Sequence, residues 1–459
     1  MPASPTDQNT NPTVVFLSSC VAMLAVGVNG TAIMAALPTM RTELALGPAG
    51  VQWTINAYLV VSAACIVMGG AAADRFGARK TAMVGLALFA IASSLIAIAE
   101  AEATVLAARA LQGIGAALAV PSTLADVRIT APPERQGSAI GAWTGFLMLG
   151  FSVGPVIGGA LTHFTSWRVI FWLNVVLMLA AIIGLVFGGA ATRRPDATPR
   201  GAADWLGFVL LAVFMVSLVF ALQELPHVSI DSVEVAGALA LALAAFVCLL
   251  TVELRVATPL FDVRFFGDRA FAMGALIASL SMMGIMSLLL YYNLYAQSQE
   301  GLGLTPLEAG VSLLPLSAAL LALAISASST AARLGLRATI MVGMALVVIG
   351  SATLGAATVK GGFGVLAIGF FVLGAGLALP YATAPQLALS SLSKAQAGQG
   401  SGMVSACTFL GGSIGVAAGA IAFAWSGFVA VLVMLAFIGA LGVALGRWIP
   451  GAARSAHPD

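Results

Sequence analysis

Charge is the scarcest property of this 459-residue chain. Only 8% of its residues are Asp, Glu, Lys or Arg, whereas 60% are hydrophobic. A soluble domain carries about 25% charged residues, so this chain cannot cover itself with a solvated surface. The composition therefore excludes a soluble globular protein, and the net charge of +2 indicates no nucleic-acid partner.

Residues that bind metals or act as nucleophiles are equally sparse. The four cysteines fall singly in four different apolar runs, and the three histidines are scattered. No spacing resembles a metal site or a disulfide framework. We therefore expect no metal, no other cofactor and no enzymatic activity. A membrane enzyme or signalling protein is kept only as a third hypothesis, because no soluble domain exists to signal through.

Long apolar runs fill most of the chain. Many reach the ~20 residues that a helix needs to cross a bilayer, whereas a membrane β-barrel would show short alternating segments. We predict an all-α polytopic membrane protein with fourteen spans. They lie roughly at 14–36, 51–72, 79–99, 103–124, 137–161, 169–189, 205–224, 234–252, 270–294, 306–328, 337–357, 362–384, 400–423 and 425–447.

A charged turn between two apolar runs occurs twice. The segment 75–88 aligns with 333–346 at a constant offset of 258 residues, and nine of the fourteen positions are identical. An internal repeat of this kind indicates two related halves. At about 33 residues per span, the offset corresponds to eight spans, which places both turns on the same side of the membrane.

Two six-helix bundles and an inserted helix pair satisfy this spacing. We expect the N-terminal bundle at 1–189, a cytoplasmic linker at 190–204, the inserted pair at 205–252, and the C-terminal bundle with its short tail at 253–459. With both termini in the cytoplasm, sixteen Lys and Arg residues lie inside and three outside. This distribution follows the positive-inside rule.

The first charged turn contains an acidic residue that membrane topology does not require. A basic hairpin accounts for its Arg and Lys residues, but not for Asp74, which is Ala332 in the second copy. We interpret Asp74 as part of a conformational latch that caps the facing helix and pairs with Arg128 or Arg135. The predicted latch consists of Gly70, Asp74, Arg75, Gly77, Arg79 and Lys80.

Small residues spaced four apart recur in the spans 137–161 and 400–423. Such glycines line one helix face and let a neighbouring backbone approach closely, and Pro155 is expected to kink its helix. Generic packing is the plain alternative, but the repeated position favours an interface that moves. The residues are Gly150, Gly154, Pro155, Gly158 and Gly159, then Gly411, Gly415 and Gly419.

Arg109 is the one basic residue inside a predicted span. A charged side chain at a helix centre costs about 2.5–3.5 kcal/mol, so such residues usually face a polar cavity. Snorkelling toward the helix end is the alternative. Gln112, at i+3, extends the same polar stripe, which favours a functional role.

Other polar or aromatic residues within spans are candidates for the wall of a cavity between the halves. Each is equally well explained as an inter-helix hydrogen bond. No carboxylate occurs at mid-membrane, and Asp126, Asp204 and Glu253 lie near span ends, with Asp126 kept as a coupling candidate. The remaining candidates are Asn29, Thr31, Asn56, Tyr58, Tyr291, Tyr292, Asn293 and Gln297.

Together these motifs resemble the major facilitator superfamily, over essentially the whole chain. The first charged turn is similar to its loop motif, and the run from Gly150 to Gly159 to its antiporter motif. The stretch Arg109-x-x-Gln112-Gly113-x-Gly115 is similar to its fourth-helix motif. Two further stretches, Ser166-Trp167-Arg168 to Asn174 and Gly301 to Pro315, resemble the fourteen-helix drug:proton antiporter branch.

This resemblance implies a secondary transporter of a bacterial cytoplasmic membrane that exports amphipathic compounds in exchange for protons. The loop motif would latch the outward-facing state, and Arg109 would belong to the coupling machinery. A monomer is expected, because both glycine motifs are most simply used within one chain.

One departure from the branch bears on coupling. Its first helix usually carries Leu-Asp-x-Thr, where this chain reads Val28-Asn29-Gly30-Thr31. An amide cannot carry a proton, which favours the alternative of an uncoupled facilitator or uptake carrier for a neutral metabolite. A cavity with Arg109 and no deep acid is also expected to suit neutral or anionic compounds better than multiply charged cations.

Overall fold

The computed structural model describes residues 11–132, 135–189, 204–225, 228, 232–256, 259, 261–360, 363–393 and 396–450. Within these residues every element is a helix, which confirms the all-α prediction. The predicted linker 190–204 lies outside the described residues, apart from Asp204.

The chain order of the helices follows the predicted spans closely. The first six are α1 (Pro12–Glu43), α2 (Pro48–Phe76), α3 (Ala78–Ala97), α4 (Glu102–Thr130), α5 (Gln136–Phe164) and α6 (Arg168–Phe187). Then come α7 (Trp205–Glu224), α8 (Val233–Glu253) and the short 3-10 helix η3 (Val263–Gly267). The last are α9 (Arg269–Gln297), α10 (Pro306–Ser312), α11 (Leu314–Leu334), α12 (Leu336–Lys360), α13 (Phe363–Leu389) and α14 (Ala397–Gly446).

Thirteen of the described helices are long and apolar enough to cross a membrane. The last, α14, has 50 residues, and a straight helix of that length would measure about 75 Å, far more than the ~30 Å hydrocarbon core. Its backbone leaves helical geometry at Ser426 and Gly427. The element is thus two helices joined by a kink, at the boundary predicted between the last two spans.

The predicted span 306–328 is wrong at its start. The segment forms two helices, α10 and α11, and only Leu314–Leu334 qualifies as a membrane span. Thr305 and Glu308 form a capping box that begins α10. Leu313 then interrupts it, and Pro315 occupies the first turn of the next helix. Apolar composition alone could not reveal this break.

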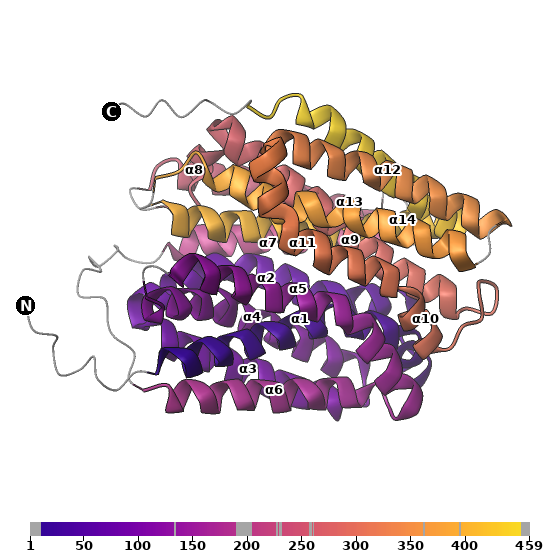
Figure 1. The fold of residues 1–459 in the computed structure, drawn as a ribbon, viewed down its shortest axis with the longest axis horizontal. Coiled ribbons are helices and arrows are strands. Elements are labelled where there is room, and N and C mark those ends of the chain that lie inside the picture. The colour runs from indigo at the N-terminus through magenta and orange to yellow at the C-terminus, as the bar shows by residue number, and fades with distance from the viewer. Residues whose placement is uncertain are drawn as a thin grey trace, which may run out of the picture.

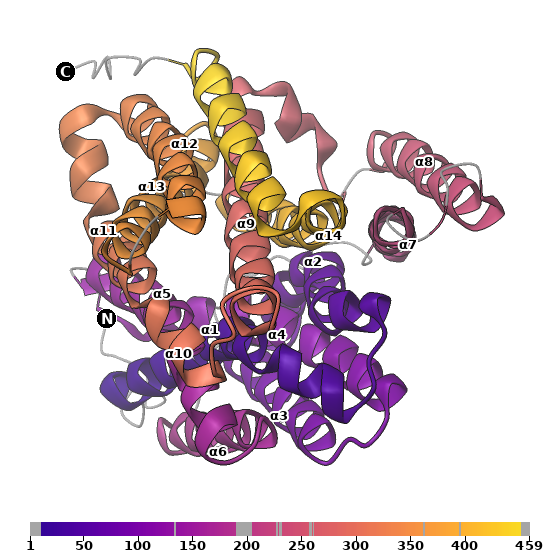
Figure 2. The same cartoon turned by 90° about the vertical axis from the view of Figure 1, so that its right-hand side faces the viewer.

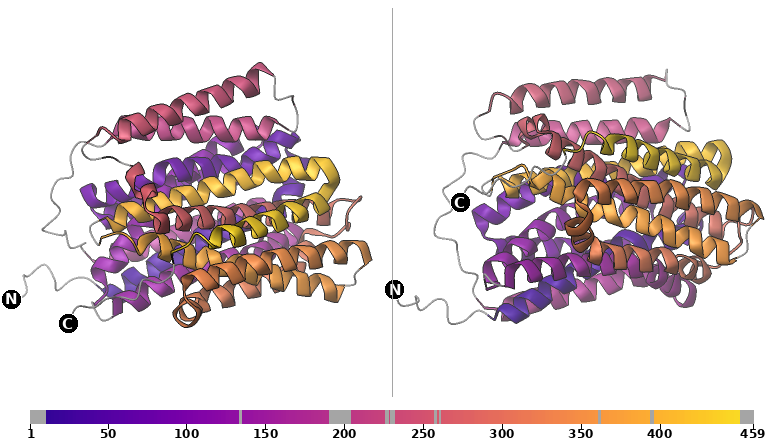
Figure 3. Two further views of the ribbon diagram at one scale, coloured as in Figure 1. Left: turned by 90° about the horizontal axis from the view of Figure 1, so that it is seen from above. Right: turned by 45° about the horizontal axis from the view of Figure 1, so that its top comes forward.

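Two helix groups lie side by side, with α7 and α8 beside them. Helices α1–α6 pack against one another, as do α9 and α11–α14. Viewed along the helices, α7 lies against α2 and α14, and α8 is outermost (Figure 2). Figure 3 shows the same pair along one edge of the molecule. The boundaries at 1–189, 205–252 and 253–459 that we predict for the two bundles and the inserted pair remain predictions.

Both charged turns reverse the chain through a glycine. Gly77 (φ +97°) separates α2 from α3, and Gly335 (φ +85°) separates α11 from α12. Positive φ is strained for any residue with a side chain, so the repeated glycine is a backbone requirement. Both turns lie at one end of the molecule, which we call the turn end; the opposite end, which holds α10, is the far end.

The repeated glycine motifs bring two helix pairs into backbone contact. A Cβ added to Gly150 or Gly158 of α5 would lie within 3.0 Å of backbone atoms of α1. In the second half, a Cβ on Gly411 or Gly415 would lie 2.6–2.7 Å from Cα atoms of α9. The predicted close approach is therefore present at equivalent places in both halves.

We expect Gly150→Ala to destabilise the protein by about 1–3 kcal/mol, the usual cost of overpacking, because its methyl group would meet Val28 N at 2.8 Å. Gly145→Ala in the same helix is the matched control, since no atom lies within 4 Å of its added Cβ. Thermal unfolding of the purified protein measures both. Equal melting temperatures for the two variants would contradict the packing role of Gly150.

Candidate functional site

A cavity of about 3220 Å³ lies between the two helix groups. Its wall is drawn from α1, α2, α4 and α5 on one side and from α9, α11, α13 and α14 on the other. It opens at the turn end, where Asp74, Arg75 and Lys80 line its mouth. Its inner wall includes Tyr58 and Arg109. Pockets that bind drug-sized ligands occupy about 300–1,000 Å³, so this space is ample for one.

Direct contacts between the halves close the far end. A Cβ added to Gly310 of α10 would lie 2.5 Å from the carbonyl oxygen of Pro155 in α5, and one added to Gly159 of α5 would lie closer still to the carbonyl oxygen of Pro306. Gln297 of α9 donates a hydrogen bond to the carbonyl oxygen of Ala35 in α1 at 2.9 Å. The α5 motif thus faces α1 with one set of small residues and α10 with another.

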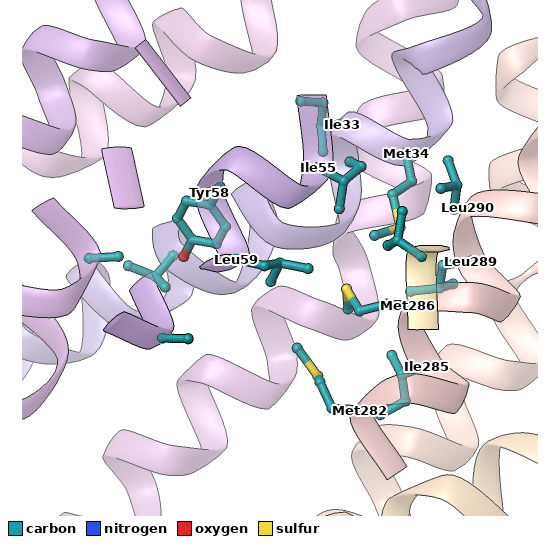
Figure 4. Packing of buried hydrophobic residues seen from close by; sticks show 14 of the residues in the cluster. Ile33, Met34, Ile55, Tyr58, Leu59, Met282, Ile285, Met286, Leu289 and Leu290 are labelled. Atoms are coloured by element: carbon teal, nitrogen blue, oxygen red, sulfur yellow. The ribbon is translucent and has the colours of Figure 1, made fainter. Parts of the chain in front are cut away.

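An apolar seam lies between this closed end and the cavity. Figure 4 shows it as Ile33 and Met34 of α1, Ile55 and Leu59 of α2, and Met282, Ile285, Met286, Leu289 and Leu290 of α9. Met282 and Met286 also line the cavity. Flexible methionine side chains fill irregular gaps and adapt to different neighbours. They therefore suit a surface that packs between the halves and also lines the cavity.

Arg109 is buried, with 1% of its surface exposed. Its Nε donates to the carbonyl oxygen of Thr54 at 2.7 Å and its Nη1 to Oε1 of Gln112 at 2.7 Å. Its guanidinium lies 4.5 Å from the centre of the Tyr58 ring. No described carboxylate pairs with it, so neutral oxygens and an aromatic face stabilise this charge.

Asn29 lies at the centre of the same network. Its Oδ1 accepts hydrogen bonds from Gln112 at 3.3 Å and from Asn174 at 2.9 Å. Gln112 also donates to Ser93 at 2.8 Å. The network therefore links α1, α3, α4 and α6 around Arg109. Nδ2 of Asn29 is buried and has no hydrogen-bond partner among the described residues.

A second buried charge cluster joins two predicted sets of residues at the turn end. Arg79 of the latch motif donates to Asp126 through Nε at 3.0 Å and Nη2 at 3.2 Å. Its Nη1 also donates to the carbonyl oxygens of Gly188 and Gly189 after α6. The two side chains are 3% and 2% exposed. Asp126 is thus held in a bidentate ion pair that ties α3, α4 and α6 together.

The other latch residues lie at the cavity mouth. Gly70, Asp74, Arg75, Gly77 and Lys80 line it, and Asp74, Arg75 and Lys80 are exposed. Arg79 differs from them because it points into the N-terminal helix group. The motif therefore combines a buried structural arginine with an exposed charged surface.

Only part of the predicted cavity set lies on the cavity wall. Tyr58, Arg109 and Asp126 do. The others lie within helix contacts: Thr31 donates to the carbonyl oxygen of Phe151 in α5, and Asn56 to that of Ser413 in α14. Hydrogen bonding between helices, the alternative reading of the sequence, describes them better.

The far-end residues of the predicted set also bond within and between helices. Tyr291 donates to the carbonyl oxygen of Val416, and Tyr292 shares a hydrogen bond with Ser312. Asn293 donates to the carbonyl oxygen of its own helix at Leu289 and accepts from Gln297. None of them lines the cavity.

Sequence reasoning missed several partners in these clusters. Ser93 carried no signal, because serines are common in membrane helices. Asn174 stood out only through the family motif. Glu43 was assigned no role, yet at the far end it pairs with Arg168 at 2.6 Å and accepts from Trp167. The Ser-Trp-Arg stretch thus joins α6 to the end of α1.

We expect Asp126→Asn to destabilise the protein by about 3–5 kcal/mol, because it leaves the Arg79 guanidinium buried without its counter-charge. The double variant Arg79→Met/Asp126→Leu removes both charges and should be less destabilised than the single one. Thermal unfolding checks this, with the exposed Arg128→Gln as control. An Asp126→Asn variant as stable as wild type would contradict a structural ion pair.

Comparison with known proteins identifies the family. A family model described as Major Facilitator Superfamily matches residues 15–415. The tetracenomycin C resistance and export protein of Streptomyces glaucescens is 31% identical, over 88% of this chain and 75% of its own. The multidrug resistance protein Stp of Mycobacterium tuberculosis is 27% identical, over 91% of this chain and 77% of its own.

A solved structure is similar across the whole fold. The crystal structure of an auto-inhibited POT family peptide transporter superimposes with a TM-score of 0.67 at 16% identity and covers 98% of both chains. At this identity the likeness shows the fold alone. The family match over most of the chain decides the matter: this chain belongs to the Major Facilitator Superfamily and is a multi-pass bacterial membrane transporter rather than an enzyme.

Proposed function

We propose that this chain exports small amphipathic compounds, drugs or toxic metabolites, across the bacterial cytoplasmic membrane by alternating access. The observation that carries the proposal is the 3220 Å³ cavity between the halves, open at the turn end and closed at the far end. With the turn end in the cytoplasm, as the positive-inside rule predicts, this is an inward-open state that loads its substrate from inside. The resistance and export roles in the names of its relatives support the direction.

The charge of the cavity favours neutral or anionic aromatic substrates. Arg109 lies on its wall beside the Tyr58 ring, and the described acidic residues on that wall, among them Asp74 and Asp126, are at or near the mouth. A multiply charged cation would lose its hydration there without meeting a deep counter-charge. A planar anion could stack on Tyr58 and approach the guanidinium.

The loop motif is proposed to latch the opposite, outward-facing state. Its exposed residues Asp74, Arg75 and Lys80 stand at an open mouth in this conformation. Closing that mouth would bring them against the C-terminal half, where new charge-assisted contacts can form. One chain contains both halves and the whole cavity wall, so a monomer suffices for the cycle.

Proton exchange is proposed as the energy source, with uncoupled facilitation or uptake as the second candidate. The family supports exchange, whereas the amide at Asn29, where the branch carries an acid, favours facilitation. In proteoliposomes loaded with a neutral aromatic antibiotic, antiport predicts substrate-dependent proton movement. For an uncoupled carrier, the rate of substrate counterflow does not depend on the pH gradient. If a broad panel of compounds produces neither proton movement nor counterflow, the transport proposal is wrong.

The Asn29 amide gives a gain-of-function test of the charge argument. Asn29→Asp keeps an oxygen that accepts from Gln112 and Asn174, and it replaces the unpartnered Nδ2 by a second acceptor. The added negative charge offsets Arg109, so we expect transport of a monovalent aromatic cation to rise about tenfold relative to a neutral analogue, or about 1.4 kcal/mol. Vesicle transport assays measure the ratio. Asn29→Leu is the uncharged control, and equal ratios for both variants would contradict the charge argument.

A further inference from the structure

Two carboxyl groups meet where the helix pair α7–α8 returns to the rest of the protein. Asp204 precedes α7 as its N-cap, and its Oδ1 accepts a hydrogen bond from the Gly207 N–H at 2.8 Å. Glu253 is the last residue of α8 and is fully buried. Its Oε1 accepts from the Phe261 N–H at 3.1 Å. These backbone bonds hold both carboxyl groups in place.

The two groups face each other across Gly207. A Cβ added to this glycine would lie 2.5 Å from Oε1 of Glu253 and 2.6 Å from Oδ2 of Asp204, so these two oxygens are no more than about 5 Å apart. Oδ2 of Asp204 and Oε2 of Glu253 are both buried without a hydrogen-bond partner. Two ionised carboxylates in this arrangement would repel each other and leave charged oxygens unsatisfied. Such a pair needs either a neighbouring positive charge or a bound proton.

The surrounding described residues do not supply that charge. Neither carboxylate forms an ion pair with a described Lys or Arg, and Arg264 instead donates to the carbonyl oxygen of Leu254 at 2.9 Å. Asp262, which precedes η3, adds a further negative charge nearby. The other charged groups on the packed elements are Arg255 after α8, Asp74 and Arg75 at the end of α2, and Glu224 and Glu234 at the opposite ends of α7 and α8; α14 has none.

A proton is the ligand that fits this site. It needs only two oxygens, whereas a metal ion needs several ligands, and no group of three metal-binding side chains occurs in the described part of the chain. A proton taken up from water would turn one carboxylate into an O–H donor and remove the repulsion between the two groups. Asp204, Trp205 and Asp262 line the large cavity, so cavity water lies beside Asp204, whereas Glu253 is buried behind it.

We propose that Asp204 and Glu253 together bind one proton at the mouth of the cavity. When the proton leaves, repulsion between the two carboxylates weakens the contact between the start of α7 and the end of α8. Proton binding stands on the geometry alone. Its use as the exchanged proton of an antiporter rests on the proposed function.

Infrared difference spectroscopy of the purified full-length protein tests the binding site. At neutral pH, well above the usual carboxyl pKa of about 4, we expect a protonated-carboxyl C=O band that shifts in heavy water. Glu253→Gln and Asp204→Asn should each abolish it, and the control Asp262→Asn should keep it. Absence of the band from wild type, or its survival in both variants, would overturn the proposal. So would stabilisation of the wild type by sodium chloride but not by choline chloride, which indicates a metal cation.

A transport assay separates binding from coupling. In proteoliposomes, Glu253→Gln should lose at least tenfold in proton-driven exchange while keeping substrate counterflow. A variant that lacks the band but exchanges protons at the wild-type rate would overturn the coupling role. Absence of counterflow in the wild type would overturn the proposed transport function, and the spectroscopic result would still decide the proton site.

Discussion

Close backbone approach between helices is the constraint on which the rest of this structure depends. The hydrocarbon core offers no hydrophobic force to hold helices together, so packing must do so. Glycines of α5 and α14 let α1 and α9 approach closely. Thr31 of α1 then donates to a carbonyl oxygen of α5, and Ser279 and Ser287 of α9 donate to carbonyl oxygens of α14. The same α5 also meets α10 at the far end. A movement of α5 would therefore change its contacts with α1 and α10 together.

Buried charged groups are placed differently from the contacts between the halves. Arg79 and Asp126 are paired and buried, and Arg109 contacts the amide of Gln112, a carbonyl oxygen and an aromatic ring. Both clusters lie within the N-terminal helix group, where they join helices rather than halves. The contacts between halves described above are apolar, glycine-rich or neutral hydrogen bonds instead, as at the seam of Met282 and Met286 (Figure 4) and from Gln297 to Ala35. Contacts of that kind can break without leaving a buried charge behind, as the proposed alternating access would require.

Much of the architecture could be predicted from periodicity, because spans and glycine repeats are local features. The 258-residue repeat identified Gly77 and Gly335 as equivalent turns, and both adopt positive φ. Side-chain partners could not be predicted in this way. Asp126 lies 47 residues from Arg79 in the chain, and Asn174 lies 145 from Asn29. The short helix α10 was missed because capping by Thr305 and Glu308, rather than hydropathy, defines it.

Distances across the two ends of the cavity test the central claim most directly. Spin labels at the equivalent positions Phe76 and Leu334 span the open turn end, and labels at Phe164 and Val311 span the closed far end; all four side chains are exposed. In a variant without the four native cysteines, pulsed electron paramagnetic resonance can measure both distances between spin labels while the substrate concentration and the pH are changed. Alternating access predicts that the turn-end distance shortens as the far-end distance lengthens. Distances that change together, or that stay fixed in a variant that still transports, would contradict the account.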